Sequence, residues 1–219
     1  MTSPAPLVVG FDLDMTLIDT RPGFAATLRA LTAETGVALD VEAMCANLGP
    51  PLDHMLAPYH PAEELPGLVD RFRALYPEHA VAATRALDGA HEALAAVRRH
   101  GGRSVLVTGK YTRNAALHVD RLGFDVDHLA GEVWGVGKAA VLRDQGASVY
   151  VGDHVHDVEG ALAAGAVSVS VLTGGSTETL SAPAARAPST SWTWSPTYTD
   201  APWSRSTAAL PTPQTSPAR

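Results

Sequence analysis

The sequence predicts an α/β protein with a Rossmann-like parallel sheet and an inserted α-helical unit. Three observations lead to this fold class. An apolar run at residues 7–11 ends abruptly in acidic residues, helical patterns alone fill residues 22–85, and short apolar runs alternate with helical patterns from residue 86 onward. Strands that alternate with helices form parallel sheets through right-handed crossovers. The first strand therefore belongs with the strands after residue 86, and the helical stretch interrupts the core.

The first element is the run Leu7–Phe11, which is followed by Asp12, Asp14 and Thr16. A short apolar run of this kind predicts a buried parallel strand, and open α/β sheets bind their ligands at the carboxyl ends of such strands. Residues i and i+2 of an extended segment point the same way, so the two carboxylates share one site. They need a cation, a proton or a tight turn to coexist. This arrangement suits Mg²⁺, and a carboxylate there can attack phosphorus.

The insertion is predicted over residues 19–85. Its helices are indicated by the patterns FAATLRALTAETG and LPGLVDRFRALYPEH, and they are interrupted at Gly36 and at the Gly49-Pro50-Pro51 cluster. No strong strand pattern occurs in this stretch. The insertion is therefore expected to be entirely helical.

The core is predicted to comprise residues 1–18 and 86–175. Its second part contains, in order, the helix DGAHEALAAVRRHG, the strand SVLVTG, the helix YTRNAALHVDRLG, a short strand near 126–130, the helix GKAAVLRDQG, the strand ASVYVGD, the helix DVEGALAAG and the strand AVSVSVLTG. Gly101 and Gly102 end the first of these helices.

Residues 176–219 are expected to form an irregular tail. Ser, Thr, Pro and Ala make up 29 of the 39 residues after residue 180, and no helical or strand period is present. Such a composition is typical of a disordered segment. Three of the four tryptophans of the chain also occur here, which is unusual for disorder. A shift of the reading frame near 177–180 is therefore a second hypothesis, and translation of the other two frames of the gene tests it.

Composition limits the classes of function. A length of 219 residues with 46% hydrophobic residues suits one domain, or a core with a small insertion. The net charge of −7 disfavours non-specific binding to nucleic acid or to an anionic membrane, and no apolar run approaches the ~20 residues of a membrane span. A single cysteine and the lack of a signal-peptide pattern indicate a cytoplasmic protein.

Further candidate residues follow the other predicted strands. Thr108, Gly109 and Lys110 follow the second strand, where a hydroxyl and backbone N–H groups can bind phosphate. Lys138 opens a later helix and can neutralise a phosphoryl oxygen, although Lys110 competes for that role. Asp153 ends the strand SVYVG, with Asp157 four residues further on. Together with Asp12 and Asp14, these residues suit a hard metal ion with phosphate as its co-ligand.

These motifs, in this order, resemble those of the haloacid dehalogenase-like (HAD) hydrolases. Asp12-Leu13-Asp14-Met15-Thr16 resembles the DxDxT motif of the family, Thr108 its second motif, Lys138 its third, and the segment from Gly152 to Asp157 its GDxxxD motif. The resemblance covers about residues 7–175. It is strongest to the phosphoglycolate-phosphatase and nucleotidase-like subgroup, which has a helical cap between the first and second motifs.

The resemblance implies specific roles. Asp12 would be the nucleophile that forms an aspartyl-phosphate, and Asp14 would protonate the leaving alcohol and then activate water. Mg²⁺ would be held by the Asp12 carboxylate, the Asp14 carbonyl and Asp153. Thr108, Gly109 and Lys138 would bind phosphate. Thr16 and Asp157 would support the site, the latter at the metal or at Lys138.

The selection of substrate is assigned to the cap and its hinge. Arg21, Gly49, Pro50 and Lys110 are candidates for it. Arg71 and Arg73, on a predicted cap helix, are expected to be solvated charges, although one of these arginines could contact a second anionic group of a substrate. Trp134 is interpreted as a packing residue.

The expected function is therefore a Mg²⁺-dependent phosphatase acting on a small phosphorylated metabolite, in an oligomeric state that the sequence leaves open. Three alternatives stay open. A phosphomutase would have the same motifs, and a catalytically weak binding or regulatory protein would follow if the tail leaves the core unfinished. A haloacid dehalogenase needs no second acid or metal, so Asp14 argues against it.

Overall fold

A parallel sheet forms the centre of the molecule in the computed structural model, which describes residues 6–174, 191–194 and 204–206. The order of its strands is β5-β4-β1-β6-β7-β8-β9, and all neighbours are parallel except β8 and β9. The strands are β1 (Val8–Phe11), β4 (Arg103–Val107), β5 (His128–Ala130), β6 (Val149–Gly152), β7 (Val167–Val171), β8 (Ser191–Trp194) and β9 (Ser204–Ser206). The predicted α/β class is confirmed, and β1 lies between β4 and β6 as a central strand.

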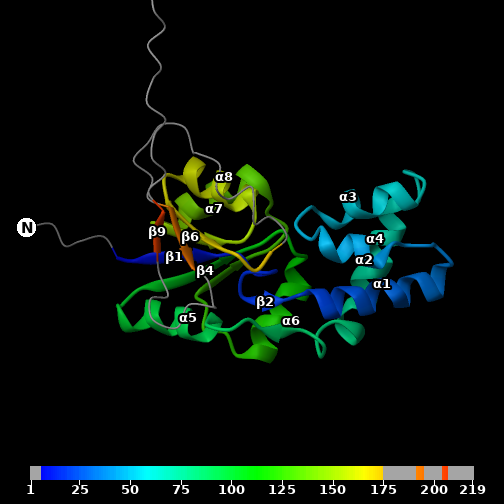
Figure 1. Cartoon of the computed structure of the whole chain (residues 1–219), viewed down its shortest axis with the longest axis horizontal. Coiled ribbons are helices and arrows are strands. Elements are labelled where there is room, and N and C mark those ends of the chain that lie inside the picture. Colours follow the sequence, from blue (N-terminus) through cyan, green and yellow to red (C-terminus); the bar gives the residue numbers. More distant parts are fainter. Residues whose placement is uncertain (1–5, 175–190, 195–203, 207–219) are drawn as a thin grey trace, which may run out of the picture.

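Helices cover both faces of the sheet (Figure 1). One face carries α5 (Ala90–Arg99) and α6 (Thr112–Leu122), and the other carries α7 (Lys138–Gln145) and α8 (Val155–Ala164). Alternate residues of β1 point to opposite faces, so Val9 and Phe11 pack toward α5 and α6 while Val8 packs toward α7 and α8. Two apolar layers thus hold the sheet between its helices.

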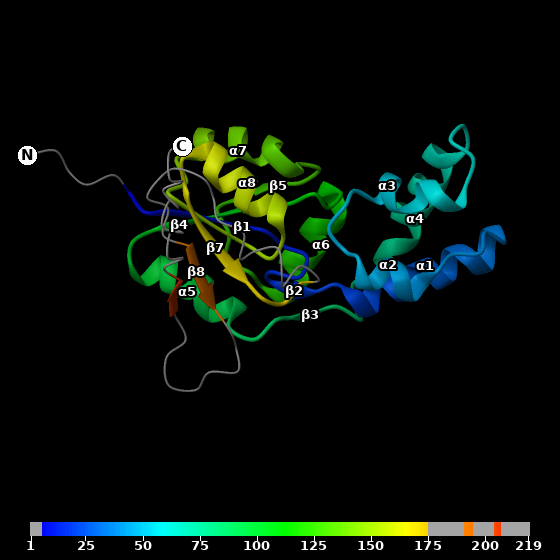
Figure 2. The same cartoon turned by 45° about the horizontal axis from the view of Figure 1, so that its top comes forward.

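The predicted helical insertion contains four helices and a short 3₁₀ turn. They are α1 (Arg21–Thr35), α2 (Val41–Ala46), α3 (Leu52–Leu56), η1 (Ala57–Tyr59) and α4 (Leu65–His79). We call residues 19–85 the cap. Its apolar side chains form a cluster of their own, with Leu28, Leu31 and Phe72 near its centre. The cap is therefore packed separately from the sheet, and both figures show it standing to one side of the core (Figures 1 and 2).

A short antiparallel ribbon joins the cap to the core. It consists of β2 (Ile18–Asp19) and β3 (Arg85–Ala86), with Ile18 paired to Ala86 and Asp19 to Arg85. The sequence pattern did not indicate this ribbon because two residues per strand are too few to show alternation. Since both connections run through it, the ribbon fixes the side from which the cap approaches the sheet. That side is the edge where β1 leads toward α1 (Figure 1).

The predicted tail after residue 175 lies mostly outside the described residues. The described part adds β8, which pairs in parallel with β7, and β9, which pairs with β8. The sequence showed no strand pattern in this stretch. The hypotheses of disorder and of a shifted reading frame concern residues outside the description and stay predictions, as do the exact domain boundaries. None of the helices within the described ranges has both the length and the apolar character that crossing a bilayer requires.

Candidate active site

The turn after β1 carries two of the predicted catalytic carboxylates. Asp12 follows the last residue of the strand, and its backbone N–H still donates to the carbonyl of Val151 in β6 at 2.8 Å. The chain then turns sharply, because the Leu13 carbonyl accepts from the N–H of Leu17 at 2.9 Å and Met15 adopts a left-handed φ of 58°. Asp14 therefore lies on a tight turn beside Asp12, and both line the same cavity.

Lys138 neutralises part of the charge at Asp12. Its ammonium group donates to Asp12 Oδ1 at 2.9 Å, to Asp157 Oδ1 at 2.6 Å and to the hydroxyl of Tyr150 at 2.9 Å. All four side chains are buried. Lys138 is the first residue of α7, and Asp157 lies in the first turn of α8, so two helices on one face of the sheet fix this network. Tyr150 was missed by the sequence analysis, because a tyrosine in a strand is ordinarily a packing residue.

Asp157 has both carboxylate oxygens engaged. Oδ1 accepts from Lys138, and Oδ2 accepts from the backbone N–H of His154 at 3.0 Å, which completes a capping box at the start of α8. Because of this capping box, α8 begins at Val155, two residues before the predicted start at Asp157. Of the two roles expected for Asp157, the geometry favours the orientation of Lys138.

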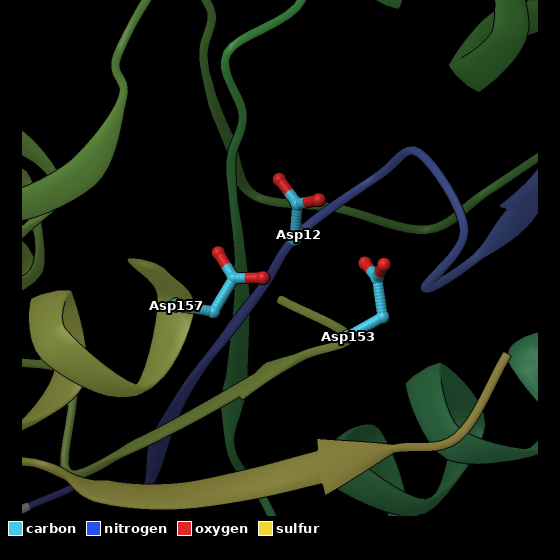
Figure 3. A group of neighbouring side chains, drawn as sticks. All are labelled: Asp12, Asp153 and Asp157. Atoms are coloured by element: carbon cyan, nitrogen blue, oxygen red, sulfur yellow. The ribbon is translucent and has the colours of Figure 1, made fainter. Parts of the chain in front are cut away.

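Asp153 brings a third carboxylate to this place. It follows β6, and its Oδ1 accepts from the hydroxyl of Thr16 at 2.9 Å. Carboxylate oxygens of Asp12, Asp153 and Asp157 lie within 4.8 Å of one another. Figure 3 shows how the loop after β1, the loop after β6 and the first turn of α8 bring the three side chains together.

This cluster suits a hard divalent cation. Within the described ranges, no hydrogen bond reaches Oδ2 of Asp12 or Oδ2 of Asp153. Among the residues that the structure describes, Lys138 is the only cation bonded to this cluster, and it contacts Asp12 and Asp157. Burial raises the pKa of Asp12 to about 7, with repulsion from Asp157 and Asp14 adding to the effect and Lys138 opposing it. Burial and the charges of Asp12 and Asp157 likewise raise the pKa of Asp153 well above its usual value. The chemistry of the donor set and its excess negative charge fit Mg²⁺.

Asp14 has a different environment. Its Oδ1 accepts from the ammonium group of Lys110 at 2.7 Å and from the hydroxyl of Thr20. Burial acts to raise the pKa of Asp14, but the charge and hydrogen bond of Lys110 and the hydrogen bond of Thr20 outweigh it, so the pKa lies below its usual value. The structure thus gives each acid of the turn its own lysine, Lys138 for Asp12 and Lys110 for Asp14. The sequence analysis treated the two lysines as competitors for one role.

The residues after β4 form another wall of the same cavity. Thr108 is buried, and its hydroxyl accepts from the backbone N–H of Lys110 at 3.2 Å. Gly109 lies between them and also lines the cavity. These residues face the acids of the first turn because β4 is the parallel neighbour of β1.

The cap contributes the opposite wall. Gly49 and Pro50 line the cavity, which has a volume of about 570 Å³. The indole N–H of Trp134 donates to the carbonyl of Gly49 at 3.1 Å, and a Cβ on Gly49 would come within 2.8 Å of the His154 ring. Trp134, interpreted from the sequence as packing, therefore also binds the cap loop to the core.

A second contact joins cap and core near Asp14. The hydroxyl of Tyr76 in α4 lies 2.9 Å from Nε2 of His118 in α6, and the ammonium group of Lys110 lies 4.6 Å from the centre of the Tyr76 ring. The Tyr76 and His118 side chains are buried. No local sequence pattern indicates this pair, because it depends on how the cap docks.

Three candidate residues named in the sequence analysis, Arg21, Arg71 and Thr16, do not line the cavity. The guanidinium group of Arg21 pairs with Asp19 at 2.9 Å on the exposed side of the hinge, and that of Arg71 pairs with Glu34 on the exposed surface of the cap. Thr16 reaches the site through its hydrogen bond to Asp153, and the other candidate residues of the sequence analysis line the cavity.

Comparisons with known proteins define the class. Residues 9–162 match the model of the haloacid dehalogenase-like hydrolase family, and residues 137–191 match a second model, of HAD-hydrolase-like proteins. The chain belongs to this hydrolase family, so the family and the enzyme class expected from the motifs are confirmed.

Individual relatives point to a subgroup. The chain is 28% identical over 195 residues to a phosphoglycolate phosphatase of Caulobacter vibrioides, covering 76% of this chain and 79% of that protein. Among solved structures, protein tyrosine kinase A of Mycobacterium tuberculosis is 26% identical with a TM-score of 0.67, over 84% of this chain and 93% of that one. A haloacid dehalogenase-like hydrolase of Streptococcus pneumoniae has a TM-score of 0.70 at 19% identity, over 80% of this chain and 90% of that one, which shows the shared fold. The resemblance to the phosphoglycolate-phosphatase-like subgroup is thus confirmed.

Proposed function

We propose that this chain is a Mg²⁺-dependent phosphatase that hydrolyses a small phosphomonoester through an aspartyl-phosphate intermediate. The observation that carries the proposal is the position of Asp12. Its carboxylate lies in a cavity, bonded to Lys138 and beside Asp153, with a second acid, Asp14, on the same turn. Family membership supports the reaction class, and the phosphoglycolate phosphatase relative supports a phosphomonoester as substrate.

The first step is a displacement at phosphorus. A carboxylate oxygen of Asp12 bonds to phosphorus, the bond from phosphorus to the ester oxygen breaks, and Asp14 gives a proton to the departing alkoxide. In the second step Asp14 takes a proton from water, whose oxygen bonds to phosphorus and releases Asp12. Dividing one difficult displacement into two easier ones is what covalent catalysis offers.

The remaining residues hold the phosphoryl group and balance its charge. We assign its equatorial oxygens to the hydroxyl of Thr108, the backbone N–H of Gly109 and the ammonium group of Lys138, since charge neutralisation and positioning supply most of the acceleration in such reactions. Mg²⁺, held by Asp12, Asp153 and the carbonyl of Asp14, would supply the positive charge that keeps Asp12 ionised and offsets the charge of the phosphoryl group. The cap limits access of water to the site.

The proposal is tested by measuring phosphate release from small phosphomonoesters with Mg²⁺ and with a chelator. We expect the wild type to be active only with the metal, and Asp12→Asn to lose at least about 10³-fold in kcat/KM because the nucleophile is gone. Asp19→Asn is the matched control, since Asp19 lies on the same segment but faces Arg21 outside the cavity.

Acid quenching during turnover should trap one phosphoryl group on the peptide that contains Asp12. Turnover without metal, or full activity of Asp12→Asn, would contradict the mechanism. Conversion of a sugar phosphate to its isomer in place of free phosphate would instead support the phosphomutase alternative.

A further inference from the structure

The cap side of the cavity is apolar. Most of the cap side chains that line it are apolar, among them Phe24, Leu48, Met55, Leu65, Val69 and Phe72. They come from α1, the loop before α3, α3 itself and α4, so three helices of the cap contribute to one continuous wall. Apolar walls with a few placed polar groups are typical of pockets that bind uncharged carbon skeletons. The polar groups of this cavity lie mostly on the opposite, core side.

The cations that line the cavity already face carboxylates. Within the described ranges these cations are Lys110, Lys138 and Arg73. Lys138 is bonded to Asp12 and Asp157, and Lys110 is bonded to Asp14. A second anionic group on a substrate would therefore have to pair with Arg73.

Arg73 is poorly placed to accept such a group. Its guanidinium nitrogens lie 3.7 Å from carboxylate oxygens of Asp70 and of Glu132, and its planar group lies 4.6 Å from the centre of the Tyr111 ring. Asp70, Glu132 and a third acid, Asp53, also line the cavity. The surroundings of Arg73 are thus negative, and a substrate carboxylate there would meet like charges.

The size of the cavity also argues against a short, charged substrate. A volume of about 570 Å³ falls in the range of sites that enclose drug-sized molecules, roughly 300–1,000 Å³. A two-carbon phosphorylated acid would fill only a small part of it and would leave the half-buried side chains of the apolar wall, Leu48, Met55 and Leu65, in contact with water. An extended uncharged group would cover that wall and gain hydrophobic free energy.

We infer that the substrate is a phosphomonoester whose alcohol is an extended, uncharged and largely apolar group, as opposed to a short phosphorylated acid such as 2-phosphoglycolate. The inference rests on the proposed phosphatase function and concerns the same cavity. The phosphoryl group would lie at Asp12 and Lys138, and the apolar group would lie against the wall made by the cap.

Two matched pairs of substrates test it. The first pair is ethyl phosphate and 2-phosphoglycolate, in which a carboxylate replaces the methyl group. The second pair is benzyl phosphate and 4-(phosphonooxymethyl)benzoate, in which a carboxylate is added to the ring. We expect kcat/KM to be at least about tenfold higher for benzyl than for ethyl phosphate, and the carboxylate to lower it about tenfold in each pair. A kcat/KM for 2-phosphoglycolate equal to or above that of benzyl phosphate would overturn the inference. A preference for 2-aminoethyl phosphate over benzyl phosphate would also overturn it, because charge would then decide selection.

Variants of the cavity wall locate the effect. Met55→Gln should reduce the preference for benzyl over ethyl phosphate several-fold. Glu132→Gln should relieve the negative surroundings of Arg73 and raise kcat/KM for the two carboxylate substrates several-fold. Glu78→Gln is the matched control, because Glu78 is an exposed acid of α4 that does not line the cavity. Equal selectivity in all three variants would contradict the assignment of the wall.

A binding measurement separates this inference from the proposed function. Benzylphosphonate and phosphonoacetate cannot be hydrolysed at phosphorus, so calorimetry with Mg²⁺ reports their affinities whether or not the protein is an active phosphatase. We expect benzylphosphonate to bind at least about tenfold more tightly. If benzylphosphonate binds more tightly while none of the esters is hydrolysed, the proposed phosphatase function is wrong and the inferred apolar ligand class is still supported. If phosphonoacetate binds as tightly, the ligand class fails.

Discussion

The two acids of the first turn have opposite electrostatic environments. Burial raises the pKa of Asp12, whereas Lys110 and Thr20 lower that of Asp14. The proposed roles require the reverse, since a nucleophile must be ionised and a general acid must carry a proton. A bound cation resolves the first difference by favouring ionised Asp12. Loss of the contact between Lys110 and Asp14 during the reaction would resolve the second by allowing Asp14 to hold a proton.

Replacement of Lys110 tests how strongly it controls Asp14. In Lys110→Met the favourable charge and hydrogen bond are lost, so the pKa of Asp14 rises. The limb of the pH–rate profile that reports Asp14 should then move to higher pH by about one unit or more. Lys110→Arg keeps the charge and should leave the limb near its wild-type position. Profiles of kcat/KM that superimpose for wild type and Lys110→Met would show that Lys110 has no such role.

His118 provides a second prediction for a single residue. Burial, with a smaller effect of the Lys110 charge, lowers the pKa of His118 to about 4, from an unfolded value near 6.5. Between these values the unfolded chain binds more protons than the folded protein, so His118 makes stability fall as the pH falls from about 6.5 to about 4. We expect the free energy of unfolding to drop between pH 7.5 and 5 by about 1–3 kcal/mol more in wild type than in His118→Gln. Denaturant unfolding at both pH values measures the difference, and equal drops would contradict it.

At the scale of elements, close steric fit and a hydrogen bond both hold the cap loop at Gly49 against the core. Gly49 has a φ of 144°, its carbonyl accepts from Trp134, and the His154 ring leaves no space for a Cβ. Gly49→Ala should push the loop away from the core and weaken closure of the cap. We expect KM to rise several-fold with a smaller change in kcat, because the chemical groups on the core are untouched.

Gly67→Ala is the control for this substitution. Gly67 lies within α4, and a Cβ there would meet no atom within 4 Å. Since alanine favours the helix over glycine by about 1 kcal/mol, this variant should be slightly stabilised and kinetically unchanged. A normal KM in Gly49→Ala would show that the loop adapts without loss of function.

The elements that the sequence predicted are those with a clear period. The central strands and long helices show apolar runs or helical spacing, and the carboxyl ends of parallel strands necessarily meet, so Asp12, Thr108 and Asp153 could be placed together in advance. The ribbon of β2 and β3, and the five-residue and six-residue helices of the cap, are too short to show a period.

Contacts between cap and core were not predictable for a different reason. The pairs Tyr76–His118 and Trp134–Gly49 depend on where the cap docks, and no local sequence pattern indicates where that is. The same applies to Arg21. Its position at the hinge suggested access to the substrate, but its partner, Asp19, lies two residues away on the outer side.

At the scale of the whole molecule, the active site opposes the stability of the fold when no metal is bound. Three buried carboxylates lie together and only two of them, Asp12 and Asp157, are bonded to Lys138, so their repulsion and desolvation are costs that the apolar clusters of the core must offset. Such strain at a functional site is common, and a ligand that binds only the folded state relieves it. Stability should therefore depend jointly on pH and on Mg²⁺.

The sign of this dependence follows from Asp12. Its pKa is about 7 in the folded protein and near 3.8 in the unfolded chain, so the folded state holds a proton that the unfolded state has lost between these values. The contribution of Asp12 to the stability of the metal-free protein is therefore fully present below about pH 4 and is lost as the pH rises through 7.

Mg²⁺ binds the ionised carboxylate and should raise Tm more at pH 7.5 than at pH 5.5. Asp12→Asn, which cannot ionise, should show a smaller gain that depends less on pH. Because His118 acts with the opposite sign over an overlapping range, the comparison is made between wild type and Asp12→Asn at each pH. If thermal unfolding with and without Mg²⁺ gave the same gain in Tm at both pH values for wild type, Asp12 would not be part of the metal site.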